Sequence, residues 1–171
     1  MKRIDLARLS PGGGPIAVLG VGSSLRSDDA AGLHAAAKLG KLDLPGLVAL
    51  EAETAPENLT AELRRLAPSH LLIIDSADMG EPPGTVGLIE AGDAGTSTPG
   101  THGLSLGLLA DYLAREIGCS VTIVGIQPRS LELGGGLSEE VERGVEELVR
   151  LIKHSLASSP ASQRGRRAWR R

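Results

Sequence analysis

The sequence predicts a three-layer α/β/α sandwich around a five-stranded, mostly parallel sheet with one antiparallel strand. Short apolar runs alternate with amphipathic segments along the chain. Most of these runs are separated by a stretch long enough to hold a helix, as a parallel right-handed crossover requires. The run His70–Asp75 is apolar on both faces, which is typical of a central strand covered by helices on both sides.

Five strands are predicted from apolar runs rich in β-branched residues, namely Ile16–Val21, Leu47–Glu51, His70–Asp75, Val86–Glu90 and Val121–Ile126. Apolar side chains that recur on one face predict four helices, over Asp29–Leu39, Ala55–Leu66, Leu104–Glu116 and Ser138–His154. Acidic residues are favoured at a helix N-terminus, and proline in the first turn. Asp29 and Pro56 fit these preferences.

The short connection between the third and fourth strands indicates that the fourth strand is placed in the sheet differently from the others. It holds only ten residues, 76–85, and it includes two glycines and two prolines. Because it has no room for a crossover helix, the fourth strand should run antiparallel to the third or lie at an edge. Ligands of such sheets bind beyond the carboxyl ends of the strands, where the winding reverses. The first and third strands should flank that reversal.

The 171 residues predict one domain over 15–156, preceded by a lead-in over 1–14 and followed by a disordered basic tail over 157–171. Five of the last eight residues are arginine, whereas every acidic residue precedes Ser155. Such a tail could contact nucleic acid or an acidic partner. A dispensable, solubilising tail is the favoured interpretation.

Composition excludes several classes of protein. One cysteine excludes an internal disulfide framework and any cysteine-cluster metal site. Two aromatic residues argue against a surface that stacks nucleic-acid bases. No apolar run approaches the ~20 residues that span a bilayer, and the N-terminus lacks the apolar region of a secretory signal. We therefore expect a soluble cytoplasmic protein with no nucleic-acid or membrane partner.

Polar residues collect at the predicted carboxyl edge of the sheet. Asp28 and Asp29 follow the first strand, and Asp75 ends the third. His102 precedes the third helix, which must begin at this edge because it leads back to the start of a parallel strand. The loop 91–101 is long enough to carry the chain across from the opposite edge. Two carboxylates and an imidazole should therefore converge.

Carboxylates and an imidazole are suited to a divalent ion such as Zn²⁺, Ni²⁺ or Mn²⁺, with open positions for water or substrate. An ion held in this way can polarise a carbonyl or lower the pKa of a bound water. Without a metal, the two carboxylates could share a proton as an acid/base pair. Each residue also has a structural interpretation: a helix cap for Asp28 or Asp29, a polar strand end for Asp75 and a loop histidine for His102.

Two other motifs give weaker indications. The pair Gly20 and Gly22 resembles a dinucleotide-binding fingerprint, but Leu25 stands at its third glycine position. The pattern around Ser105, Gly-Leu-Ser-Leu-Gly, matches a nucleophile elbow, yet no apolar strand leads into it. A hydrolase that uses Ser105 is therefore the less favoured reading. Cys119 is expected to be a buried small hydrophobe.

Five stretches in the same order and spacing resemble the hydrogenase maturation proteases, endopeptidases that trim the C-terminus of the large subunit of [NiFe] hydrogenases. They are VLGVGSSLRSDDAAG (18–32), ETAPENL (53–59), LLIIDSADMGEPPGTV (71–86), THGLSL (101–106) and VGIQP (124–128). The resemblance covers residues 16–152. It implies an α/β/α sandwich with one antiparallel strand and a peptidase activity.

By this resemblance, the metal-binding acids of the family fall on Asp29 and Asp75, and its histidine on His102. The implied substrate is a large-subunit precursor that already carries nickel, so the substrate itself could supply the ion. Asp28 or Asp78 is expected to support these residues by hydrogen bonding.

The chain departs from the family at Ser23, where asparagine is usual, and at Ala30, where glycine is usual. A non-catalytic maturation chaperone that binds the precursor or its metal would need the same three residues, Asp29, Asp75 and His102. The sequence therefore leaves that alternative open.

Overall fold

The structure is a computed structural model that describes residues 14–89 and 106–158. Five strands form one sheet in the order β2-β1-β3-β5-β4. The strands are β1 (Ile16–Val21), β2 (Leu47–Glu53), β3 (His70–Ser76), β4 (Val86–Ile89) and β5 (Ser120–Ile126). The helices are α1 (Ala31–Lys41), α2 (Thr60–Leu66), α3 (Leu106–Ile117) and α4 (Glu139–Ser158), and the short 3₁₀ helices η2 (Ser27–Ala30) and η3 (Pro56–Leu59) precede α1 and α2.

The predicted fold class is confirmed. Strands β2, β1, β3 and β5 are parallel, whereas β4 lies at the edge and pairs antiparallel with β5. The expected edge position is therefore correct, and the partner of the antiparallel strand is β5 rather than β3. The segment after β3 reaches β4 across the end of β5, where Ala77 N–H donates to the Ile126 carbonyl at 3.0 Å. No crossover helix is needed for this short step.

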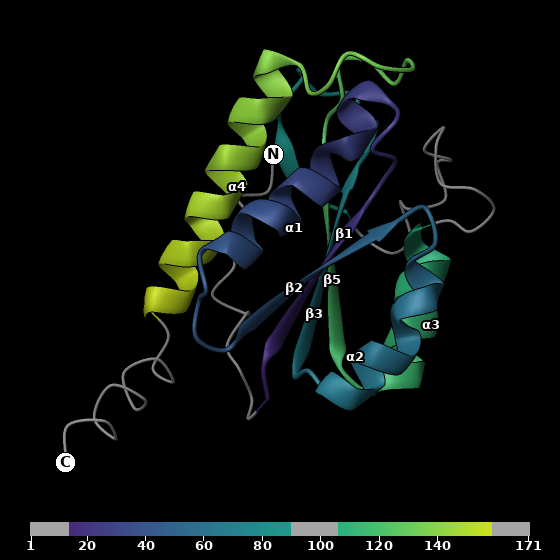
Figure 1. Cartoon of the computed structure of the whole chain (residues 1–171), viewed down its shortest axis with the longest axis vertical. Helices are drawn as coiled ribbons and strands as arrows, with labels where there is room; N and C mark the ends of the chain where they lie inside the picture. The colour runs from purple at the N-terminus through teal and green to yellow at the C-terminus, as the bar shows by residue number, and fades with distance from the viewer. Residues whose placement is uncertain (1–13, 90–105, 159–171) are drawn as a thin grey trace.

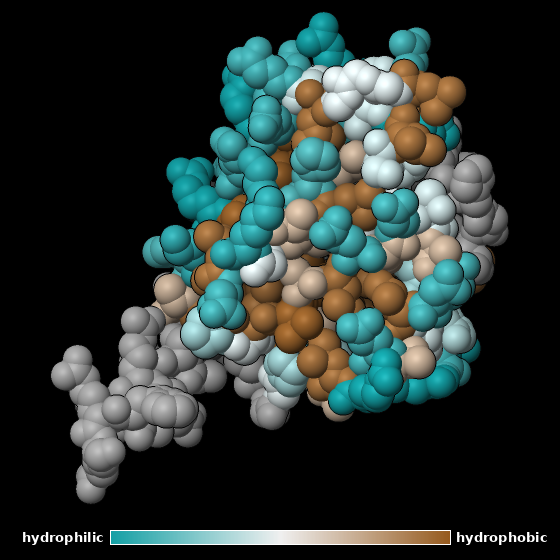
Figure 2. All heavy atoms as spheres, in the orientation of Figure 1, coloured by the Kyte–Doolittle hydropathy of each residue, from teal (hydrophilic) through white to brown (hydrophobic). Residues whose placement is uncertain are grey.

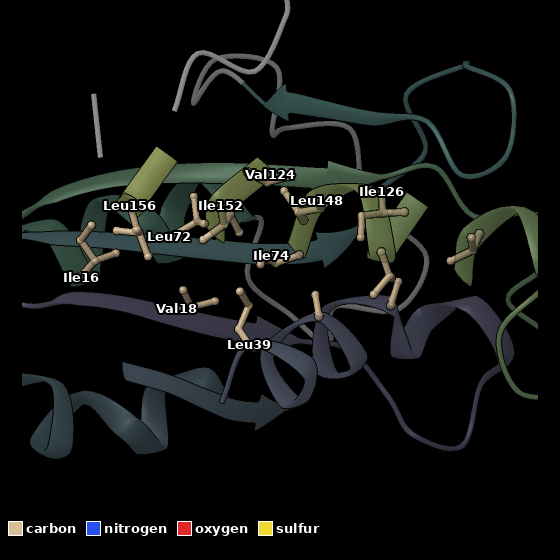
Figure 3. Packing of buried hydrophobic residues seen from close by; sticks show 14 residues of the cluster. Ile16, Val18, Leu39, Leu72, Ile74, Val124, Ile126, Leu148, Ile152 and Leu156 are labelled. Atoms are coloured by element: carbon tan, nitrogen blue, oxygen red, sulfur yellow. The ribbon is translucent and has the colours of Figure 1, made fainter. Parts of the chain in front are cut away.

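Helices cover the sheet in two layers. Helices α1 and α4 lie on one face and α2 and α3 on the other (Figure 1). Successive side chains of a strand point to opposite faces. Val18 and Leu72 accordingly pack with the first pair of helices, together with Leu39, Leu148 and Ile152 (Figure 3). The alternate residues of the same strands pack with α2 and α3, as Leu19, Leu71 and Ile73 do with Leu63 and Leu113.

Close packing of α1 on the sheet places the segment that carries the first acidic pair. A Cβ on Gly32 would lie 2.2 Å from the carbonyl oxygen of Ile74 and 2.3 Å from that of Val21. Only glycine therefore lets the start of α1 contact the ends of β1 and β3. As a result, η2 lies directly at the carboxyl edge of these two strands, where the winding of the sheet reverses.

The boundaries of the predicted lead-in and tail fall mostly outside the described residues, and those assignments remain predictions. Helix α4 continues to Ser158, a little beyond the predicted end at His154. Within the described parts of the chain, no helix is both long and apolar enough to cross a membrane.

Candidate active site

Asp29 and Asp75 meet at the carboxyl edge of the sheet. Strands β1 and β3 are parallel neighbours, and Asp29 follows β1 while Asp75 lies near the end of β3. Ser76 links the two acids: its hydroxyl donates to Asp29 Oδ1 at 3.2 Å, and its backbone N–H donates to Asp75 Oδ1 at 2.8 Å. All three side chains are buried. We call Asp29 and Asp75 the acid pair.

The second oxygen of Asp75 is buried without a hydrogen-bond partner in the part of the chain that the structure describes. Among the described residues, Asp75 Oδ2 is the buried side-chain polar atom left without one. Burial, and next the negative charge of Asp29, raise the pKa of Asp75 to about 8, although the Ser76 N–H bond opposes this shift. A buried polar atom without a partner destabilises the fold, so it needs an explanation, and a catalytic role or a bound ion is one.

The raised pKa predicts how stability depends on pH. Between about pH 4 and pH 8, folded Asp75 holds a proton that the unfolded chain has lost. Stability contributed by this group is therefore fully present below pH 4, and rising pH removes up to about 1.4 kcal/mol per unit. In urea unfolding, the free energy of the wild type relative to Asp75→Asn should fall across this range. A difference that does not change with pH would contradict this prediction.

Asp29 is held by the turn that follows β1. Its Oδ2 accepts a hydrogen bond from the Ser23 N–H at 3.1 Å. Gly22 has φ +137°, and a Cβ there would lie 1.8 Å from the Asp29 carbonyl oxygen. The turn can close on Asp29 only because residue 22 is glycine. Ala30 is buried with φ −76°, an ordinary conformation for a residue with a side chain, so the fold accommodates its methyl group.

Asp28 belongs to a different network from its neighbour Asp29. It is fully buried, and its carboxylate accepts four hydrogen bonds from the segment between β5 and α4. Oδ2 accepts from the N–H groups of Arg129 and Ser130, and the Ser138 hydroxyl and N–H donate to Oδ2 and Oδ1. Asp28 therefore fastens this segment to η2. No described hydrogen bond joins it to the acid pair.

Asp78 also has partners other than the acid pair. Its Oδ1 accepts from the Gln127 side-chain amide and from the Gly80 N–H, both at 3.2 Å. The side-chain oxygen of Gln127, Oε1, in turn accepts from the Met79 N–H at 2.7 Å and from the Glu81 N–H. Gln127 thus holds the segment that leaves β3. The expected direct support of the acid pair by Asp28 or Asp78 is not found among the described residues, where Ser76 and the Ser23 N–H supply it.

His102 and Ser105 lie outside the described residues, so their predicted roles remain predictions. The described residue nearest to His102 on its C-terminal side is Leu106, the first residue of α3. Within 14–89 and 106–158, no group of three His, Cys, Asp or Glu side chains could hold a metal ion. Of the three predicted ligands, Asp29, Asp75 and His102, these parts of the chain contain the two carboxylates.

Ser76 and Gln127 are the polar contacts at this edge that the sequence reading missed. Both directly follow buried strand residues, where a polar side chain is unusual. This position in the sequence is the feature from which their role could be predicted. Cys119 was expected to be buried but is only partly so, and it packs against the cluster under α2 and α3.

Comparison with known proteins places the chain in a family. A family model for hydrogenase maturation proteases, HycI, matches residues 34–155. The hydrogenase 3 maturation protease of Escherichia coli is 33% identical over 137 residues, which cover 80% of this chain and 87% of that protein. The chain belongs to the hydrogenase maturation protease family. It is therefore a peptidase, and the less favoured reading as a small-molecule hydrolase loses its support.

Solved structures of hydrogenase maturation proteases share the fold. The crystal structure of HycI from Thermococcus kodakarensis superposes with a TM-score of 0.78 at 27% identity, covering 90% of this chain and 99% of that one. The solution structure of the endopeptidase HycI from Escherichia coli gives a TM-score of 0.72 at 30% identity, covering 82% and 90% of the two chains.

Proposed function

We propose that this peptidase removes the C-terminal extension of a [NiFe] hydrogenase large-subunit precursor, and that Asp29, Asp75 and His102 bind the nickel that the precursor carries. The observation that supports this most is the buried Asp75 Oδ2, which has no described partner and belongs to a carboxyl group that Ser76 joins to Asp29. The names of the relatives, hydrogenase maturation proteases, support the class of substrate.

The donor set suits a divalent ion. Carboxylate oxygens and an imidazole nitrogen are common ligands of nickel and zinc. Asp29 already accepts one hydrogen bond on each oxygen, which orients its carboxylate, whereas Asp75 Oδ2 has no partner among the described residues. A ligand at Asp75 Oδ2 would relieve the cost of burying that atom without a partner. The ion is part of the substrate, so the acid pair need not hold one permanently.

The residues of this chain then position the precursor for cleavage. With the precursor's nickel at the acid pair, the peptide bond beyond it lies at the carboxyl edge of β1 and β3. The ion supplies positive charge that can polarise a neighbouring peptide carbonyl. A carboxylate of the acid pair can accept the proton of the attacking water, a general-base role within reach of a peptide held there. Ser76 keeps both carboxylates oriented for these tasks.

The test uses the purified chain and a large-subunit precursor prepared with and without nickel. Mass spectrometry should show loss of the C-terminal extension only when both the chain and nickel in the precursor are present. A loaded precursor that is bound but never shortened would favour the maturation chaperone instead. Equal cleavage of the nickel-free precursor would remove nickel from the recognition step.

Ser76→Ala tests how the acid pair is oriented. The variant loses the hydroxyl that donates to Asp29, while the backbone bond to Asp75 remains. We expect kcat for precursor cleavage to fall about tenfold, with KM little changed, because loss of orientation acts mainly on the reacting geometry. Ser76→Thr, which keeps a hydroxyl, should recover most of the rate. If both variants lose activity equally, the hydroxyl is not the group that matters.

A further inference from the structure

We propose that Leu25 and Leu133 form a docking surface for an apolar segment of the precursor next to its cleavage site. This inference rests on the proposed function and adds to it the chemistry of substrate recognition. Leu25 lies in the turn after β1, and Leu133 lies in the segment between β5 and α4. We call these two side chains the leucine platform.

The leucine platform is unusual in its exposure. Among the described residues, Leu133 and Leu25 are the most exposed large hydrophobic side chains, at 82% and 72%. Scattered single leucines on a surface need no explanation, but here two segments far apart in sequence, each with an exposed leucine, are hydrogen-bonded to each other. The Gly134 N–H donates to the Leu25 carbonyl at 2.9 Å, and the Ser27 N–H donates to the Gly134 carbonyl at 3.2 Å. Figure 2 shows apolar surface at the end of the molecule where these two segments lie in Figure 1.

The backbone beneath the leucine platform is extensively hydrogen-bonded. Arg26 Nε donates to the Leu131 carbonyl at 3.0 Å, and the Ser27 hydroxyl donates to the Gly136 carbonyl at 3.0 Å. The buried Asp28 carboxylate adds four bonds to the same two segments. Two apolar side chains are thus presented on a preorganised support. A surface of this kind loses little conformational entropy when a partner binds.

The leucine platform is linked to the acid pair by hydrogen bonds at Ser23. Leu25 and Asp29 both lie in the connection between β1 and α1. The Ser23 N–H donates to Asp29 Oδ2, and its hydroxyl accepts from the Leu25 N–H at 3.4 Å. A polypeptide held at the acid pair must extend over the neighbouring loops at this edge. The leucine platform offers it apolar contact rather than charge, so the occupant should be an apolar stretch of the precursor.

The experiment compares cleavage of the nickel-loaded precursor by the wild type, Leu25→Ser, Leu133→Ser and the double variant. Each single change should raise KM about five- to tenfold, and the double change about fiftyfold, as expected for lost burial of one or two leucines. The kcat should stay within about twofold, because neither leucine has a group that can bind the ion or transfer a proton. The midpoint of thermal unfolding should not change, since both leucines are exposed in the free protein.

Two controls sharpen the comparison. Leu42→Ser changes an exposed leucine at the opposite end of α1 and should leave KM unchanged. Leu133→Met keeps an apolar side chain and should restore KM. An unchanged KM in the double variant, with normal cleavage by the wild type, overturns the docking surface alone. Failure of the wild type to cleave the precursor overturns the proposed function, and this inference with it.

Discussion

Asp75→Asn is expected to abolish processing of the nickel-loaded precursor while the chain stays folded. The amide has nearly the same size as the carboxyl group, so packing around β3 should be kept. It cannot, however, replace a carboxylate as a ligand of a divalent ion or as a base. We expect kcat/KM to fall by at least about a thousandfold, the scale observed when a catalytic group is removed. Mass spectrometry of the large subunit measures the loss.

The matched control is Asp43→Asn, which makes the same chemical change at an exposed residue just after α1. Asp43 has a positive φ of 44°, a conformation that asparagine also tolerates, so the control should fold normally. It should process the precursor at the wild-type rate. Undiminished processing by Asp75→Asn would remove Asp75 from the mechanism. A loss shared by both variants would point to a general effect of the lost charge.

Asp28→Asn is expected to destabilise the fold, in contrast to the same change at Asp29. Four donors converge on the fully buried Asp28 carboxylate, and an amide must turn its own N–H₂ toward at least one of them. The loss should be about 3 kcal/mol, because bonds to a charged acceptor are replaced by a buried donor facing a donor. Urea unfolding, followed by circular dichroism, measures the change.

Asp29→Asn should behave in the opposite way. The Asp29 carboxylate accepts two hydrogen bonds, and removing its charge also removes one cause of the raised pKa of Asp75. We therefore expect a stability within about 1 kcal/mol of the wild type, together with loss of precursor cleavage. If instead Asp29→Asn unfolds the chain and Asp28→Asn leaves it stable and inactive, the two neighbouring acids have exchanged roles.

Local patterns were sufficient to predict the architecture. Apolar runs, helical periodicity and the lengths of connections are properties of short segments, and they predicted every strand and helix of the sheet to within a few residues. The ten residues after β3 correctly indicated an edge strand. They could not indicate its partner, because pairing with β5 depends on the later strand that inserts between β3 and β4.

By itself, the sequence determined the fold class, the point where the winding of the sheet reverses, and the acids that follow β1 and β3. The family resemblance pointed to Asp29 rather than Asp28 as the acid of the site. Only the tertiary structure showed that Ser76 joins Asp29 to Asp75 and that Asp28 fastens the segment before α4. The same is true of the hydrogen bonds between the segments that carry Leu25 and Leu133. The reason is physical: these roles depend on side-chain direction and on contacts between distant segments. A change of one residue along a 3₁₀ turn sends a carboxylate toward a different neighbour.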